Sequence, residues 1–282
     1  MEVGLSKQQL RDVVGQAVRD HYAHVRGVSS REFASRYFSV TREQAAVEKV
    51  LTRIQMMARH LPTKKPALRV LDVGVGTGSL PVALNTLGFD MYGLDDDSGG
   101  QRQLSTLARR FPTLKMQVCA LEADDYPYED NTFDAVTSFD VIEHLPGSPR
   151  HYLAEICRIL KPGGLFFLSN PNVVSLANRV QVLVGRSIYH PLNEWFNPLA
   201  DDDTIEFAGH WREYGVAELV YMVEATGFRV IEKGCRSRLL LGRARFSNTF
   251  QRIVYAACDT LATIFRGMGD EAYVICQKPS AQ

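Results

Sequence analysis

The stretch VLDVGVGTGS, residues 70–79, combines a carboxylate with three closely spaced glycines. Asp72 comes two residues before the first of these glycines, which are Gly74, Gly76 and Gly78. Glycine lets a backbone turn tightly and approach a ligand closely, and a helix that follows such a turn directs unpaired N–H groups at the ligand. The pattern therefore predicts a ligand-binding loop between a strand and a helix.

Asp72 narrows the kind of ligand that this loop can hold. A P-loop for nucleoside triphosphates is excluded because no Gly-Lys-Ser/Thr follows the glycines. The dinucleotide-binding fingerprint has the spacing G-x-G-x-x-G, whereas this chain has G-x-G-x-G followed by Ser79. A carboxylate would also repel a pyrophosphate, but it would attract an ammonium or sulfonium group. We therefore expect a ligand that carries a positive charge.

The N-terminal part of the chain is predicted to be helical. Apolar residues recur at helical spacing in residues 7–25 and 41–61, and Thr41 is the expected N-cap of the second helix. A short linker that contains prolines, LPTKKPAL, follows. We therefore predict a helical N-terminal cap over residues 1–65 and a second domain over residues 66–282.

In the second domain, short apolar segments alternate with helical patterns. Strands are expected at 68–74, 89–95, 114–120, 131–140, 165–170, 229–235 and 271–278, and helices at 79–88, 99–111, 149–160, 215–228 and 248–267. This alternation predicts an α/β fold, Rossmann-like and doubly wound, with a mostly parallel seven-stranded sheet. Residues 171–212 are too long for a plain connection and are predicted to form a lid or substrate-binding insertion.

Taken in order, the motifs resemble those of the class I S-adenosylmethionine (SAM)-dependent methyltransferases over residues 69–170. LDVGVGTG resembles that family's first motif, and ILKPGGLFFLSNPN resembles its structural fifth-strand signature. YGLDDD resembles the second motif, in which an acid at the end of strand two holds the ribose hydroxyls. The resemblance implies this role for Asp95, with Asp96 as the neighbouring alternative, because a carboxylate can accept both hydroxyl hydrogen bonds.

The adenine-binding residues follow from the third motif, which LEADDYPYEDNTFDAV resembles. The resemblance implies that Glu122 and the backbone N–H of Ala123 read the adenine edge. Glutamate replaces the usual aspartate at this position, so Asp124 and Asp125 are alternatives.

The methionine part of the cofactor is assigned by the fourth-strand motif, which SFDVIEHL resembles. Tyr37 is expected to cover the cofactor from the N-terminal cap. The complete set of implied cofactor-binding residues is Asp72, Gly74, Gly76, Gly78, Asp95, Asp96, Glu122, Ala123, Ser138, Phe139, Asp140 and Tyr37.

Two histidines are candidates for the chemical step. SAM carries its methyl group on a sulfonium, so transfer is an in-line displacement that leaves S-adenosylhomocysteine, and a hydroxyl acceptor also needs a base. His144 follows the fourth strand, near the expected position of the methyl donor. His210 lies in GHWREYGVAEL, which resembles a GH-x-REY stretch in methyltransferases of bacterial sugar and polysaccharide pathways. His210 is the expected base or substrate contact, or alternatively a polar anchor for the lid, and Arg212 and Glu213 are expected to form a structural ion pair.

Two further segments bear on the acceptor. His190, Trp195 and Phe196 are expected to line the lid, either as a ring-binding surface or as a hydrophobic hinge. Residues 236–265 combine four arginines with an amphipathic helical pattern. That segment is predicted to pack on the sheet, and contact with a membrane surface or a lipid-linked substrate is the alternative.

Composition excludes several classes of protein. Lys plus Arg and Asp plus Glu both number 32, so the chain lacks the basic excess that is typical of nucleic-acid partners. The 5 cysteines form no C-x-x-C pair, which argues against a disulfide framework and a zinc site, and no other metal site is predicted. The absence of a signal-peptide pattern and of long apolar runs predicts a cytoplasmic protein.

The sequence thus predicts a SAM-dependent methyltransferase that acts on a small molecule. O-methylation of a sugar or polysaccharide precursor is the first expectation and rests on the GHWREY resemblance. Methylation of a quinone-like or natural-product ring is an alternative, and so is a SAM-binding regulatory protein without catalysis.

Overall fold

The computed structural model describes residues 6–28, 38–62, 67–96, 101–189, 210–237, 257, 260–261 and 267–280. Tyr37, His190, Trp195 and Phe196 lie outside the described residues, as does most of the helix expected at 248–267. The positions of that helix that are described, 257, 260 and 261, are helical.

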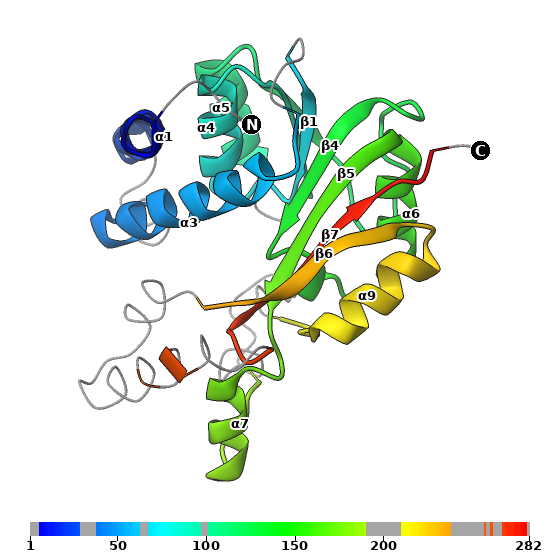
Figure 1. Cartoon of the computed structure of the whole chain (residues 1–282). Helices are drawn as coiled ribbons and strands as arrows, with labels where there is room; N and C mark the ends of the chain where they lie inside the picture. The colour runs from blue at the N-terminus through cyan, green and yellow to red at the C-terminus, as the bar shows by residue number, and fades with distance from the viewer. Residues whose placement is uncertain are drawn as a thin grey trace, which may run out of the picture. The chain divides into compact units, whose positions relative to one another are not determined.

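Two helices form the N-terminal part, as predicted. α1 (Lys7–Val28) packs on α3 (Val40–Ala58), and both contact α4 (Ser79–Thr86) (Figure 1). The prediction of Thr41 as the N-cap of the second helix is wrong. Ser39 is the cap, because its backbone is extended and its hydroxyl accepts a hydrogen bond from the N–H of Arg42 at 3.4 Å, whereas Thr41 already lies in the first turn.

Seven strands form one sheet in the order β3-β2-β1-β4-β5-β7-β6. β1 pairs in parallel with β2 and β4, β2 pairs in parallel with β3, and β6 pairs antiparallel with β7. The predicted doubly wound, mostly parallel fold is therefore confirmed. The strands are β1 (Arg69–Val73), β2 (Asp90–Asp95), β3 (Lys115–Val118), β4 (Phe133–Phe139), β5 (Leu160–Pro171), β6 (Arg229–Arg236) and β7 (Glu271–Gln277).

Helices connect these strands, and α4, α5, α6 and α9 lie where the sequence predicts them, whereas α7 and the 3₁₀ turn η1 were not predicted. The connecting elements are α4, α5 (Gln101–Arg110), a single 3₁₀ turn η1 (Ile142–His144), α6 (Arg150–Ile159), α7 (Leu176–Leu183) and α9 (Val216–Ala225), and α9 packs on β6 and β7 (Figure 1). β5 begins at Leu160, five residues before the expected start, directly after α6. Gly163 has a φ of +79°, and a Cβ on Gly164 would lie only 2.7 Å from the carbonyl oxygen of Lys161. The KPGG segment can therefore form part of the strand because both positions are glycine.

The chain divides into two compact units. The first contains the described residues up to Thr137 together with Arg158–Phe166, and the second contains Ser138–Cys157 and the described residues from Phe167 to Pro279. The N-terminal helices thus belong to the same unit as β1, β2 and β3. In the described part of the chain, no helix is long and apolar enough to cross a membrane.

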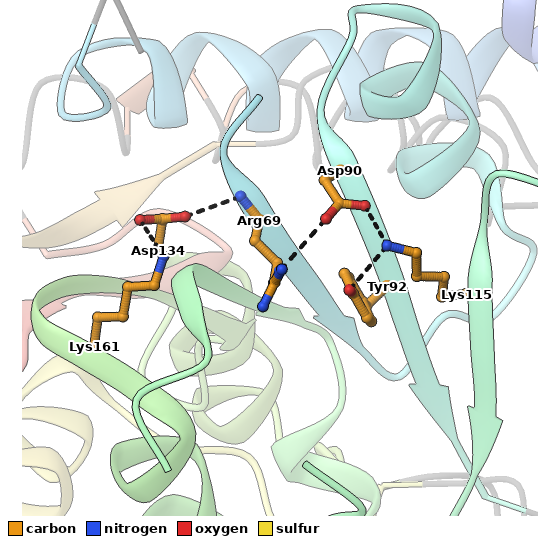
Figure 2. A network of polar contacts seen from close by, with 6 residues as sticks. All are labelled: Arg69, Asp90, Tyr92, Lys115, Asp134 and Lys161. Carbon is orange, nitrogen blue, oxygen red and sulfur yellow. Dashed lines mark hydrogen bonds and ion pairs between the residues drawn. The ribbon is translucent and has the colours of Figure 1, made fainter. Parts of the chain in front are cut away.

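In the first unit, a network of charged side chains joins the starting ends of neighbouring strands (Figure 2). Lys115 Nζ contacts Asp90 at 2.7 Å and the hydroxyl of Tyr92 at 2.9 Å. Asp134 accepts hydrogen bonds from the backbone N–H of Arg69 at 3.0 Å and from Lys161 Nζ at 2.9 Å. Because these side chains are partly exposed, each contact contributes modestly to stability. They align the strands at their amino ends and leave the carboxyl ends, where ligands bind in such sheets, to other residues.

Candidate functional site

The glycine loop leaves the carboxyl end of β1 in the conformation that its spacing predicts. Gly74, Gly76 and Gly78 all have positive φ, at 77°, 51° and 76°. Side chains with a Cβ rarely adopt this region, so the alternation of glycines is what permits the loop to fold in this way. The N–H of Gly74 donates to the carbonyl of Leu94 at 2.7 Å, and Gly78 is the N-cap of α4.

Asp72 is a buried carboxylate on β1, one residue before the strand ends. Its side chain accepts a 2.6 Å hydrogen bond from the hydroxyl of Thr137, its register partner on β4. The pKa of Asp72 is raised to about 7, chiefly by burial and to a smaller extent by the negative charge of Asp95, while the Thr137 hydrogen bond and the Arg53 charge oppose this rise. A cation bound beside Asp72 would favour its ionised form.

Asp95 connects the end of β2 to the glycine loop. One carboxylate oxygen accepts from the N–H of Gly76 at 2.8 Å, and the other accepts from the N–H of Asp96 at 3.0 Å. Burial raises the pKa of Asp95, while these backbone donors lower it. Asp95 is therefore placed to hold the loop as well as a ligand, whereas Asp96 is half-buried and one residue further along.

The predicted adenine residues lie in a turn that follows β3. The N–H of Ala123 donates to the carbonyl of Ala120 at 3.2 Å, and Asp124 accepts from the N–H of Ala120 at 3.0 Å. Asp124 thus stabilises the turn itself. Glu122 is a half-buried carboxylate in the same turn, and its contact with adenine stays a prediction.

In the second unit, the residues at the carboxyl end of β4 are held by buried contacts. Ser138 is buried and accepts a hydrogen bond from the hydroxyl of Tyr152, and Phe139 is buried as well. Asp140 has a φ of 58° and donates its N–H to the carbonyl of Ser169 at 2.9 Å. A left-handed aspartate is a strained position that is often found at functional sites.

The two predicted catalytic histidines lie side by side in the second unit. The rings of His144 and His210 meet edge to face, with centroids 4.9 Å apart. Nδ1 of His210 is 2.7 Å from a carboxylate oxygen of Glu213. The expected ion pair between Arg212 and Glu213 is wrong, because Arg212 pairs with Glu218 at 2.8 Å and Glu213 faces His210.

Two clamps hold the segment that carries His210. The backbone carbonyl of Glu143 accepts from the N–H groups of Trp211 and Arg212, at 2.7 and 3.3 Å. At the other end of the segment, the side-chain amide of the buried Asn170 forms hydrogen bonds with both the N–H and the carbonyl of Tyr214, at 2.7 and 3.1 Å.

A cluster of side chains of the types that bind metal ions also lies here, where the sequence predicts no metal site. Ligand atoms of Glu143, His144 and His210 all lie within 4.8 Å of one another. Glu143 is buried, whereas its neighbour in sequence, His144, is exposed to solvent. This donor set of one carboxylate and two imidazoles suits a transition metal better than a magnesium ion.

Three contacts, one in the first unit and two in the second, escape sequence reasoning. Thr137 orients Asp72, Asn170 holds the His210 segment, and Glu213 contacts the His210 ring. The first two act over long sequence separations, and no local motif marks them. Glu213 could have been found, because i and i+3 side chains often meet.

Comparisons with known proteins give the family. Residues 42–233 match the family described as Methyltransferase domain. The chain belongs to this methyltransferase family. The predicted enzyme class, a SAM-dependent methyltransferase, and the predicted cofactor, SAM, are therefore confirmed.

Relatives and solved structures agree with this family. A probable SAM-dependent methyltransferase of Mycolicibacterium smegmatis is 30% identical over 63% of this chain and 58% of its own length. A ubiquinone biosynthesis O-methyltransferase of Burkholderia thailandensis is 29% identical over 71% of this chain and 79% of its own. The solved SAM-dependent methyltransferase of Archaeoglobus fulgidus has a TM-score of 0.53 at 18% identity and covers 87% of this chain and 98% of its own, which shows the shared fold.

Proposed function

We propose that this methyltransferase transfers the methyl group of SAM to a ring hydroxyl of a phenol- or quinol-like small molecule. The observation that carries the proposal is the contact between His210 Nδ1 and the Glu213 carboxylate. A carboxylate only accepts hydrogen bonds, so it favours the neutral tautomer with the proton on Nδ1 and the lone pair on Nε2. That is the form in which a histidine acts as a general base.

The proposed reaction balances without another reactant. His210 takes the proton of the ring hydroxyl as the oxygen attacks the methyl carbon, the C–S bond breaks, and S-adenosylhomocysteine leaves as a neutral thioether. The relative from Burkholderia thailandensis is named an O-methyltransferase of ubiquinone biosynthesis, which supports a ring acceptor over a sugar. A sugar acceptor rests on the GHWREY resemblance alone.

Incubation with SAM and a panel of acceptors tests the acceptor class. The panel contains prenylated catechols and hydroxybenzoates on one side and free and nucleotide-linked sugars on the other. Mass spectrometry is expected to find methylated rings together with S-adenosylhomocysteine. Methylation of sugars alone would overturn the ring proposal, and SAM binding with no transfer to either class would favour the non-catalytic alternative.

Variants of the His210 pair test the base. His210→Ala and Glu213→Gln are expected to lower kcat by about two orders of magnitude, the usual contribution of a positioned base, without weakening SAM binding. Arg212→Gln is the control, because this neighbouring side chain is exposed and pairs with Glu218 instead. If a chelator abolishes turnover and a divalent cation restores it, Glu143, His144 and His210 act as metal ligands and the base proposal fails.

For the cofactor, we propose that SAM binds at the glycine loop with its ribose on Asp95. Asp95→Ala is expected to weaken SAM binding strongly in calorimetry, because the ribose loses its acceptor and the loop loses its tie to Gly76. Asp96→Ala is the matched comparison. Loss of binding in Asp96→Ala alone would move the ribose to that residue, and unchanged binding in both variants would refute the placement.

A further inference from the structure

His21 reaches from α1 to the glycine loop of the first unit. Its Nε2 lies 2.7 Å from the backbone carbonyl of Thr77, a residue 56 positions later in the chain. The side chain is only 2% exposed. Because a carbonyl only accepts, the imidazole donates the proton of Nε2 in this contact.

The neighbour of His21 on the same helix approaches the same loop. The side chains of Ser79 and Thr77 lower the pKa of Tyr22 against the larger, opposing effect of burial, and their two hydroxyl oxygens lie 2.9 Å apart. The ring of His21 contacts Phe38 edge to face and also Phe111, with centroids 5.9 and 6.3 Å away. Two consecutive residues of α1 thus face one short stretch of the loop, and His21 makes the hydrogen bond to it.

Thr77 is the position at which such a contact constrains the loop most. It lies between Gly76 and Gly78, whose left-handed backbones give this part of the chain high conformational freedom when it is not held. The carbonyl of Thr77 and the N–H of Gly78 belong to one peptide plane. A donor that fixes the carbonyl therefore also fixes the direction of the Gly78 N–H at the start of α4.

A purely apolar role would not require a histidine at this position. Nδ1 of His21 is buried with no hydrogen-bond partner among the described residues, which has a cost that a phenylalanine would avoid. The pKa of His21 is lowered to about 4, chiefly by burial and to a smaller extent by Arg110 and His24, against the effect of the Thr77 hydrogen bond. The imidazole therefore stays neutral near pH 7, with its single proton on Nε2.

We propose that His21 is a positioning residue for SAM binding, which holds the glycine loop in its binding conformation through the Thr77 carbonyl. The N-terminal helix then contributes to cofactor affinity without contacting the cofactor through this residue. The inference rests on the proposed placement of SAM at Gly74–Gly78.

Three substitutions separate the hydrogen bond from the packing of the ring. His21→Gln can place its amide nitrogen where Nε2 lies, whereas His21→Asn is too short to reach the Thr77 carbonyl, and His21→Phe keeps an aromatic ring but has no donor. We expect Asn and Phe to weaken SAM affinity by roughly fivefold to twentyfold, the range for a lost buried hydrogen bond, and Gln to restore it to within about twofold of the native protein. His24→Phe is the matched control, because it replaces a half-exposed histidine on the same helix.

Calorimetry with SAM and steady-state kinetics give the decisive readouts. Asn and Phe should raise the KM for SAM and leave kcat at saturating SAM within about twofold of the native value. Native affinity in both variants would show that His21 only packs against its neighbours. Equal losses in His21→Asn, His21→Phe and His21→Gln would show that the imidazole ring, and not its hydrogen bond, matters. If His21→Phe does not fold, the comparison of Gln with Asn decides between these outcomes.

The tautomer supplies a readout that packing alone would not move. In histidine labelled with ¹⁵N, the signal of His21 is expected to show a neutral ring protonated at Nε2 between pH 6 and pH 8. A ring protonated at Nδ1 would overturn the proposal. The Asp95→Ala variant distinguishes a failure of the cofactor placement from a failure of the role of His21. Normal SAM binding in Asp95→Ala would refute the cofactor placement. Lost binding in Asp95→Ala together with normal binding in His21→Asn would refute only the role of His21.

Discussion

The hydroxyl of Thr137 donates a 2.6 Å hydrogen bond to the Asp72 carboxylate, its register partner on the neighbouring strand. This contact fixes the orientation of a carboxylate that is only 4% exposed at the entrance to the glycine loop. It lowers the pKa of Asp72, but burial has the larger effect and raises that pKa to about 7. Asp72 is therefore a group whose charge depends on whether a cation lies beside it.

SAM affinity should fall as the pH is lowered through 7. A bound ammonium stabilises the Asp72 carboxylate, so the complex has a lower pKa than the free protein, and binding below pH 7 requires the loss of a proton. The expected decrease is at most about tenfold per pH unit. Above about pH 8 affinity should fall again, because an α-amino group titrates at roughly 7.7–8.0 and loses the charge that Asp72 attracts.

Calorimetry at pH 6, 7 and 8, in buffers of different ionisation enthalpy, measures both the affinity and the protons released. Asp72→Asn is the control and should bind SAM weakly, with no dependence on pH between 6 and 7. Arg53 and Asp95 are the charged groups that act on the pKa of Asp72. Because Asp95 is itself a carboxyl group, its protonation has to be distinguished from that of Asp72, which the Asp72→Asn control does. Affinity that is constant from pH 6 to pH 8 would contradict this account of Asp72.

Asp72→Asn should also make the protein more stable at pH 8. The pKa of Asp72 is raised in the folded state, from 3.8 to about 7, so the folded state binds more protons than the unfolded state between these values. Stability is therefore lost as the pH rises through this window, and the loss is complete above 7. The substitution removes a penalty of up to about 4 kcal/mol, and its amide oxygen can still accept from Thr137.

Urea unfolding of both proteins at pH 4 and pH 8 tests this difference. The gain in the free energy of unfolding should be present at pH 8 and nearly absent at pH 4. An Asp72→Asn protein that is less stable than the native one at pH 8 would show that the buried carboxylate is compensated by contacts other than those to Thr137 and Arg53.

Local patterns predicted most of the elements and the cofactor loop. Gly74, Gly76 and Gly78 could be assigned to a tight turn because the conformational freedom lies in each glycine itself. Asp95 could be placed at the end of a strand because alternation of strands and helices locates strand ends. The start of the second helix was missed by two residues, because Ser39 and Thr41 have similar capping chemistry and only the backbone distinguishes them.

Pairs that are distant in the chain could not be predicted from one sequence. Thr137 on β4 contacts Asp72 on the neighbouring strand β1, and His21 contacts Thr77, which is 56 residues later in the chain. Asn170 looks like part of a strand signature, yet its amide holds Tyr214. Such partners are set by strand register and helix packing, which a local pattern does not contain.

Gly78→Ala is expected to destabilise the protein more than Gly88→Ala. Both glycines have a positive φ, which costs a residue with a Cβ about 1–2 kcal/mol. At Gly88 an added Cβ has nothing within 4 Å, whereas at Gly78 it would lie 2.5 Å from Cδ1 of the buried Leu107. We expect an additional cost of about 1–3 kcal/mol at Gly78, together with weaker SAM binding. Chemical unfolding measures the first and calorimetry the second, and equal effects of the two substitutions would contradict the packing argument.

Asn170→Asp should impair turnover and spare SAM binding. The substitution keeps an oxygen that accepts from the Tyr214 N–H, but it places a second oxygen against the Tyr214 carbonyl, where Asn170 now donates at 3.1 Å. That repulsion loosens the segment that carries His210, so kcat should fall by about tenfold or more, as for a misplaced catalytic group. Asn178→Asp is the matched control, because the Asn178 amide, like that of Asn170, donates to backbone carbonyl oxygen, here of Asn172 and Val173, but lies on α7. Native turnover in Asn170→Asp would show that His210 does not depend on the Asn170 contacts. An equal loss of turnover in both variants would show that the effect is general destabilisation.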